Sequence, residues 1–161
     1  MLRLMKVSLV LTVSLWGLVG AILNITDWEG TVGAVGAATS MVTFDGGPES
    51  WQATSNPIVI WLGALFITLS KLTVFVLCLM GAVTMWQARE LSAASFANAK
   101  EFALVGCALA VVMLFGGFIA IAESWFELWR SDAMRGPVLE SAFRYGGMIA
   151  LIGLFVGMKD D

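Results

Sequence analysis

The feature that most constrains this chain is a long apolar run over residues 58–86, which carries a single charge, Lys71. A helix needs about 20 predominantly apolar residues to cross the hydrocarbon core of a bilayer, and this run exceeds that length. Pro57 precedes it, at a position where a helix loses no hydrogen bond to proline. Only helices and closed barrels satisfy their backbone in lipid, and a barrel requires many segments of alternating hydrophobicity. The run therefore predicts a membrane-spanning helix.

Three further apolar runs have the length of membrane helices. They cover residues 6–24, residues 101–122 with a polar and aromatic extension to residue 130, and residues 142–158. The first run also fits a signal peptide with a cleavage motif at residues 19–21, but we expect it to be the first membrane helix. Composition agrees with a membrane protein, because 59% of residues are hydrophobic and 13% are charged, whereas about a quarter of the residues of a soluble domain are charged.

The predicted fold class is therefore all-α, a polytopic membrane protein with four transmembrane helices in one bundle and a single domain over residues 1–161. A folded outer loop over residues 25–57 joins the first two helices. Within it, Asp27 is a suitable N-cap for a short helix over residues 28–41, although glycine makes that helix weak. A structureless connection of this length is unusual in a compact protein, so we expect the loop to fold over the helix ends.

The distribution of Lys and Arg predicts which side of the membrane each connection faces. The N-terminal segment, the connection over residues 87–100 and the C-terminal tail all contain basic residues, and the loop over residues 25–57 contains none. Short basic loops stay in the cytoplasm, which predicts cytoplasmic N- and C-termini, although Arg130 and Arg135 weaken the assignment. Tryptophan favours the membrane–water interface. The predicted interfacial anchors are Trp28, Trp51, Trp86, Trp125 and Trp129.

Small residues four positions apart let two membrane helices approach closely. Three of the predicted helices carry such a pair on one face, and we expect these pairs to mediate packing within the bundle or with a partner. The pairs are Gly17 and Ala21, Gly116 and Ala120, and Gly153 and Gly157. We therefore expect contacts with the lipid bilayer and with another membrane protein or a second copy of the chain.

Lys71 is the sharpest candidate for a functional residue. A charge inside a membrane helix is costly, by about 3 kcal/mol on insertion scales, and such residues pair with a partner or line a polar path. With Trp86 at the inner interface, Lys71 lies near the outer boundary at the depth of Glu123, which predicts an intramembrane ion pair between the two. Pairing with a partner subunit and a gate or ion site in a small transporter remain as alternatives.

Several short motifs occur together along the chain. They are Asn56-Pro57 before a Trp-containing helix, Leu77-Cys78-x-x-Gly81-Ala82, Ser95-Phe96-x-Asn98-Ala99-Lys100, Trp125-Phe126-x-x-Trp129 and Ala142-Phe143-Arg144. In these motifs and their order the chain resembles a bacterial family of predicted small integral membrane proteins of unknown function. The resemblance implies four membrane helices and the inner (plasma) membrane of a Gram-negative bacterium. It brings no established activity and no cofactor.

The sequence contains no recognisable catalytic constellation. The absence of histidine removes the commonest metal ligand and the usual axial ligand of a membrane haem. The chain has no nucleotide-binding loop and no nucleophile with a histidine base, and a net charge of -3 without a basic cluster does not suggest nucleic acid. We therefore expect a protein that is not an enzyme and has no cofactor, metal site or nucleic-acid partner.

Two classes of function are consistent with these residues. The first is an accessory or interaction subunit of a membrane protein complex, or a homo-oligomer, because small-residue faces occur without catalytic groups. The second is a small transporter or exporter with a polar site around Lys71. A pocket that reaches Lys71 favours the second class, whereas a fully packed and ion-paired Lys71 favours the first.

Overall fold

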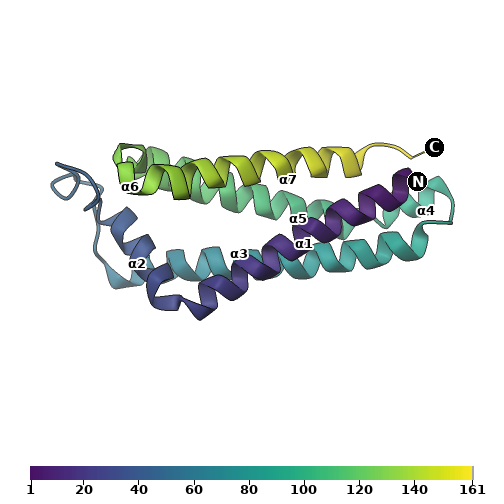
Figure 1. The fold of residues 1–161 in the computed structure, drawn as a ribbon, viewed down its shortest axis with the longest axis horizontal. Coiled ribbons are helices and arrows are strands. Elements are labelled where there is room, and N and C mark those ends of the chain that lie inside the picture. Colours follow the sequence, from purple (N-terminus) through teal and green to yellow (C-terminus); the bar gives the residue numbers. More distant parts are fainter. Residues whose placement is uncertain (161) are drawn as a thin grey trace.

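The computed structural model describes residues 1–160 as an elongated bundle whose regular structure is helical throughout that range (Figure 1). The long helices are α1 (Leu2–Thr26), α3 (Pro57–Ala88), α5 (Glu101–Val111), its continuation η1 (Val112–Trp125) and α7 (Ser141–Gly157). The short ones are α2 (Trp28–Thr39), α4 (Ala93–Asn98), η2 (Leu128–Arg130), α6 (Asp132–Met134) and η3 (Arg135–Glu140).

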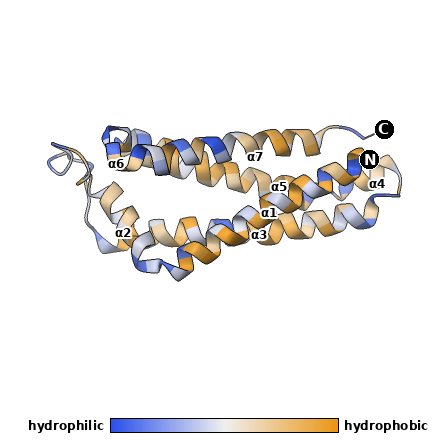
Figure 2. Cartoon of the chain, viewed as in Figure 1, coloured by the Kyte–Doolittle hydropathy of each residue, from blue (hydrophilic) through white to orange (hydrophobic). Residues whose placement is uncertain are grey.

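Four helical stretches are long and apolar enough to cross a membrane, which confirms the predicted all-α class. They are Leu2–Thr26, Pro57–Ala88, Ala93–Trp125 and Asp132–Gly157. Hydrophobic residues dominate α3 and α5, and hydrophilic residues gather toward the ends of the bundle and in the first half of α7 (Figure 2). Met1 and the end of α7 lie at the same end of the bundle, which we call the terminal end (Figure 1). We call the opposite end, which carries α2, the loop end.

Successive membrane-spanning helices pack side by side: α1 lies along α3, α3 along α5, and α5 along α7. The α1–α3 contact is close because Gly17 has no side chain. A Cβ at this position would lie 2.8 Å from the carbonyl oxygen of Lys71 and 2.9 Å from the backbone nitrogen of Phe75. Ala21 is buried on the same face of α1. This pair therefore packs between helices, as a small-residue pair allows.

The other two small-residue pairs have different positions. Gly153 and Gly157 face α5, since a Cβ on Gly153 would lie 3.3 Å from Cβ of Cys107. Gly116 and Ala120 do not pack inside the bundle. Apart from its chain neighbours and the backbone of its own helix, no atom of the described residues lies within 4 Å of a Cβ built on Gly116, and Ala120 is exposed. Both lie in η1, a π-helix, where the i→i+5 pattern shifts residues that an α-helix would align.

The third membrane helix does not continue to residue 130. Its π-helical part ends at Trp125, and Glu127 then adopts a left-handed backbone with φ 49°. The turn η2 follows as a separate element. The fourth span starts with α6 at Asp132, earlier than the predicted residue 142, because α6 and η3 lead directly into α7.

The connection between α1 and α3 folds over the helix ends, as predicted. The Asp27 side chain accepts a hydrogen bond from the Gly30 backbone nitrogen at 3.1 Å, so it caps α2. Beyond α2, the Arg130 guanidinium donates to the Asp45 carbonyl oxygen at 3.1 Å. The rings of Trp51 and Trp125 meet edge to face with centroids 5.1 Å apart. The loop is therefore anchored to the loop end of the bundle.

The predicted tryptophan anchors lie near the two ends of the helices. Trp51, Trp125 and Trp129 are exposed at the loop end, and Trp86 is exposed near the end of α3. Trp28 differs, because it is half-buried and its ring packs against Trp61 with centroids 5.3 Å apart.

Candidate functional site: an apolar cavity that reaches Lys71

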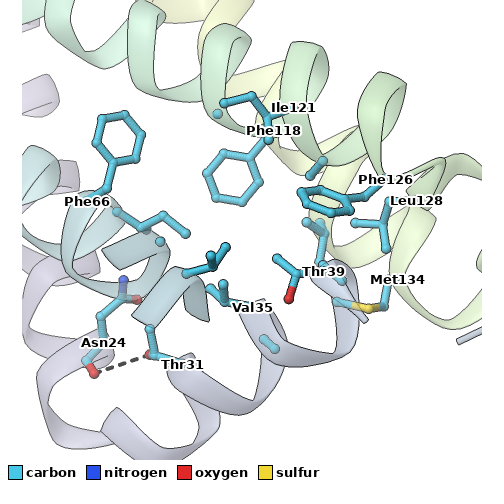
Figure 3. Close-up of a pocket in the computed structure, with 18 of the residues that line it drawn as sticks. Asn24, Thr31, Val35, Thr39, Phe66, Phe118, Ile121, Phe126, Leu128 and Met134 are labelled. Atoms are coloured by element: carbon cyan, nitrogen blue, oxygen red, sulfur yellow. Dashed lines mark hydrogen bonds between the residues drawn. The ribbon is translucent and has the colours of Figure 1, made fainter. Parts of the chain in front are cut away.

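A cavity of about 360 Å³ lies at the loop end between α2, α3, η1 and the segment that leads into α7 (Figure 3). Its walls are almost entirely apolar. The apolar side chains include those of Val35, Ala38, Val59, Phe66, Ile67, Phe118, Ile121, Phe126, Leu128, Met134 and Val138, and the polar ones are those of Asn24, Thr31, Thr39 and Lys71. Asn24 and Thr31 lie on one side, and Phe126, Leu128 and Met134 on the other (Figure 3). The cavity therefore has a polar side, with Asn24 and Thr31, and a largely apolar side, on which Thr39 is a polar residue near Met134 (Figure 3).

The Lys71 ammonium is held at the polar side by a chain of hydrogen bonds in which its partners are neutral groups. Lys71 Nζ donates to Asn24 Oδ1 at 3.1 Å, and Asn24 Nδ2 donates to Thr68 Oγ1 at 3.3 Å. Thr68 Oγ1 donates in turn to the Ala64 carbonyl oxygen at 2.9 Å, and Thr31 Oγ1 donates to the Asn24 carbonyl oxygen at 3.2 Å. The Asn24 side chain is thus held by Thr68 of α3, and the Asn24 backbone carbonyl by Thr31 of α2.

The path of the lysine side chain depends on Gly20 of α1. A Cβ at this position would lie 3.0 Å from Cδ and 3.4 Å from Nζ of Lys71. The side chain therefore passes over this glycine toward Asn24 at the end of α1. This is the snorkelling expected of a long cationic side chain in a membrane helix, in which the charged end moves away from the middle of the span.

The predicted ion pair between Lys71 and Glu123 is not formed. Among the described residues, Lys71 pairs with no carboxylate, and Glu123 takes part in no ion pair. The reason is helix rotation: η1 turns Phe118, Ile121 and Ala122 toward the cavity, and Glu123 does not line it. Sequence reasoning placed the two residues at a similar depth but could not fix the directions of their side chains.

Two helices with unusual local structure, α2 and η1, form part of the cavity wall. The helix α2 contains three glycines in 12 residues, and each glycine destabilises a helix by about 1 kcal/mol relative to alanine. Opposite it, η1 is π-helical over 14 residues, a geometry that is rare and often found at functional sites. At Gly117 in η1, a Cβ would lie 3.2 Å from the Phe66 ring of α3, so η1 approaches α3 closely at the cavity.

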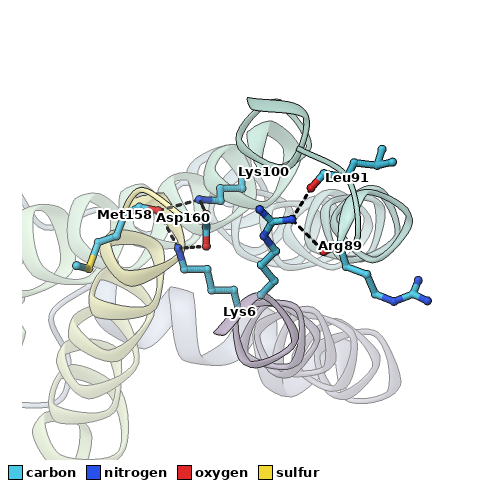
Figure 4. Close-up of polar contacts among 7 residues, drawn as sticks. Lys6, Arg89, Leu91, Lys100, Met158 and Asp160 are labelled. Carbon is cyan, nitrogen blue, oxygen red and sulfur yellow. Dashed lines mark hydrogen bonds and ion pairs between the residues drawn. The ribbon is translucent and has the colours of Figure 1, made fainter. Parts of the chain in front are cut away.

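A second polar centre lies at the terminal end (Figure 4). Lys6 Nζ lies 2.9 Å from Asp160 Oδ1, and Lys100 forms an ion pair with the other oxygen of the same carboxylate. Both lysines also donate to the Met158 carbonyl oxygen, at 2.7 and 2.8 Å. All three charged side chains are at most 4% exposed. Burial alone would raise the pKa of Asp160, but hydrogen bonds from Lys100 and Lys6 outweigh it and hold the pKa below its ordinary value.

This terminal cluster, formed by Lys6, Lys100 and Asp160, was not found by sequence reasoning. A signal was present, since the predicted topology places the start of the first helix, the connection before the third helix and the tail on one side of the membrane. Nearby, Arg3 donates to the carbonyl oxygens of Arg89 at 3.0 Å and Leu91 at 2.6 Å. The cluster ties the tail to the bundle, which indicates a structural role.

Comparison with known proteins identifies one family. The model of the family described as "Predicted small integral membrane protein (DUF2165)" matches residues 2–159. No curated protein and no solved structure matches the chain. Within the described residues, no group of three His, Cys, Asp or Glu side chains could hold a metal ion.

Proposed function

The chain belongs to this family of predicted small integral membrane proteins, and on that premise we propose that it binds a hydrophobic molecule within the membrane. The observation that carries the proposal is the cavity of about 360 Å³ at the loop end. Ligand sites are typically concave, largely apolar and about 300–1,000 Å³ in volume, with a few placed polar groups. The cavity has these properties, and Lys71 with Asn24 supplies the polar groups.

The position of the cavity suggests how a ligand reaches it. Most of its walls belong to membrane-spanning helices and to α2, and Phe126 and Leu128 come from the connection that contains η2. A hydrophobic molecule can therefore enter from the bilayer. The proposal includes cytoplasmic termini in the inner membrane of a bacterium, which puts the cavity in the outer half of that membrane. A small transporter or exporter would use the same cavity as one binding site on its path. Binding without catalysis is proposed, since the described residues that line the cavity form no catalytic constellation.

Photo-crosslinking tests this proposal directly. Purified protein in nanodiscs would be exposed to an alkyl probe that carries a diazirine, and crosslinked peptides would be mapped by mass spectrometry. We expect crosslinks to concentrate in α2, α3 and η1, and Val35→Trp, which fills the cavity, to reduce them several-fold. Leu151→Trp on the exposed face of α7 is the matched control and should change little. Labelling that is uniform over all lipid-facing helices, and insensitive to Val35→Trp, contradicts the proposal.

Reporter fusions test the orientation that the proposal includes. A reporter fused after Asn24 should read outside the cytoplasm, and one fused after Ala94 should read inside. A reporter fused after Arg130 is the critical case, because basic residues in that connection oppose the assignment. A cytoplasmic signal from the Arg130 fusion contradicts the orientation without affecting the cavity itself.

A second candidate function is an interaction subunit of a membrane complex or a homo-oligomer. The observation that favours it is the outward position of Gly116 and Ala120 in η1, because a small-residue pair that does not pack inside the bundle is available to another helix. Purification in mild detergent followed by native mass spectrometry tests it. A stoichiometric partner or a dimer that Gly116→Leu disrupts supports this function, and a lone monomer in both forms opposes it.

A further inference from the structure

We infer that the ligand of the cavity is a single-chain amphiphile with one anionic head group, which binds Lys71 while its chain lies against the apolar wall. This inference rests on the proposed function and names the class of its ligand. It follows from the charge of the cavity, from the hydrogen-bonding capacity that remains there, and from the size and polarity of the walls.

The charge of the cavity is positive and uncompensated. Among the described residues that line the cavity, Lys71 is the only ionisable one, and its sole side-chain partner among them is the neutral Asn24 amide. An ammonium in a membrane span is costly unless a partner offsets its charge. An anionic head group supplies that partner, whereas a cationic head group would add repulsion and a neutral one would leave the charge uncompensated.

The remaining hydrogen-bonding capacity also favours an anion. An ammonium has three N–H donors, and the described residues accept one of them, at Asn24 Oδ1. One N–H of the Asn24 amide donates to Thr68, and the Thr31 hydroxyl donates to the Asn24 backbone. The donors that remain free at the polar side are therefore those of Lys71 and the second N–H of the Asn24 amide, which match the acceptor oxygens of a carboxylate or a phosphate.

The volume of the cavity and the arrangement of its walls indicate the form of the rest of the ligand. A volume of about 360 Å³ is near the lower end of the range for ligand pockets, which suits one acyl chain better than two. Asn24 and Thr31 lie on one side of the cavity and Phe126, Leu128 and Met134 on the other (Figure 3). A head group at Lys71 therefore leaves the chain to extend across Phe66 and Phe118 toward this apolar side.

Competition between matched probes tests the inference. The diazirine alkyl probe would be displaced from protein in nanodiscs by dodecanoate, dodecyl phosphate, dodecanol and dodecyltrimethylammonium, which share one chain length. We expect the anions to compete at least about tenfold better than the alcohol, the difference that one charge-assisted contact supplies, and the cation to compete worst. The stronger of the two anions distinguishes a fatty-acid source from a phosphate-ester source.

Variants of Lys71 complete the test. Lys71→Met should lower the affinity for dodecanoate to that for dodecanol and leave dodecanol unchanged, whereas Lys71→Arg should keep the preference for anions. Equal competition by alcohol and anion in the wild type, or a preference that survives in Lys71→Met, overturns the inference and leaves the proposed function standing. Competition by the four dodecyl compounds on the wild-type protein tests the inference even where a variant fails to fold. Failure of every probe to compete overturns the proposed function itself.

Discussion

Replacing Asp160 by asparagine should destabilise the protein more than the removal of any other single charge at the terminal end. The carboxylate of Asp160 is 2% exposed and is shared by Lys6 and Lys100, which are 0% and 4% exposed. The substitution keeps the shape of the side chain and removes its charge. Two ammonium groups that are at most 4% exposed then remain with only the Met158 carbonyl oxygen and a neutral amide as acceptors.

The magnitude follows from the geometry. At 2.9 Å and an effective dielectric constant of about 20, the attraction in the Lys6–Asp160 pair is about 6 kcal/mol, and desolvation offsets much of it. Loss of one partner of a buried pair typically costs about 3–5 kcal/mol. The cluster lies at the terminal end of the bundle, where Asp160 also lines an open pocket, so the lower value is appropriate. We expect Asp160→Asn to cost about 3 kcal/mol of unfolding free energy.

Unfolding by SDS in mixed micelles, followed by tryptophan fluorescence, measures this difference. Glu90→Gln is the matched control, because it removes the charge from a carboxylate that is 79% exposed and pairs with Arg89 at 2.9 Å. Exposed pairs contribute about 0–1 kcal/mol, so this control should lie close to the wild type. A cost for Asp160→Asn no greater than that of Glu90→Gln would refute the argument that a buried cluster joins the tail to the bundle.

Four further outcomes are expected. The pKa of Asp160 is lowered in the folded state. The stabilisation of the fold by its charge is therefore present above the ordinary pKa of about 4 and is lost as the pH falls through the lower folded value. An acid titration of the unfolding free energy should show this loss in the wild type and not in Asp160→Asn. Gly17→Ala should lower the unfolding free energy in the SDS assay by about 1–3 kcal/mol, because its Cβ would lie 2.8 Å from a backbone oxygen of α3. Gly147→Ala is the control and should be neutral, because a Cβ there has open space among the described residues. Asn24→Leu should cost about 1–3 kcal/mol, because it leaves Lys71 without its acceptor; a neutral result would show that the ammonium is already solvated. Hydrogen exchange followed by mass spectrometry should be faster in glycine-rich α2 than in α5, and equal protection would contradict a weak cavity wall.

The number and type of the helices were predictable because hydropathy directly reports burial in lipid. A span such as α3 shows its whole length as an apolar run, so neither its neighbours nor its rotation is needed to find it. Local capping was predictable for a similar reason: Asp27 bonds a backbone group three residues away, at Gly30, and depends on no distant part of the chain. These features are properties of short segments, which a sequence displays in full.

The contacts of the charged residues were less predictable, because they depend on helix rotation. Depth along the membrane normal follows from counting residues, and it placed Lys71 and Glu123 at a similar level. The direction of each side chain also depends on how α3 and η1 turn about their own axes. A π-helical segment changes that turn without any obvious mark in the sequence. Asn24 became the partner of Lys71 because Gly20 opens the path between them.

A comparison of the buried lysines, Lys6 and Lys100, with the half-buried Lys71 separates structural charge from candidate functional charge. Lys6 and Lys100 meet a carboxylate, so their charge is compensated within the chain. Lys71 lies deeper in a span and meets only an amide, although compensation there would stabilise the fold more, because a lower dielectric strengthens a pair. Stability alone therefore does not account for a lysine with a neutral partner beside an apolar cavity. An external anion that completes the site accounts for both the missing carboxylate and the open space.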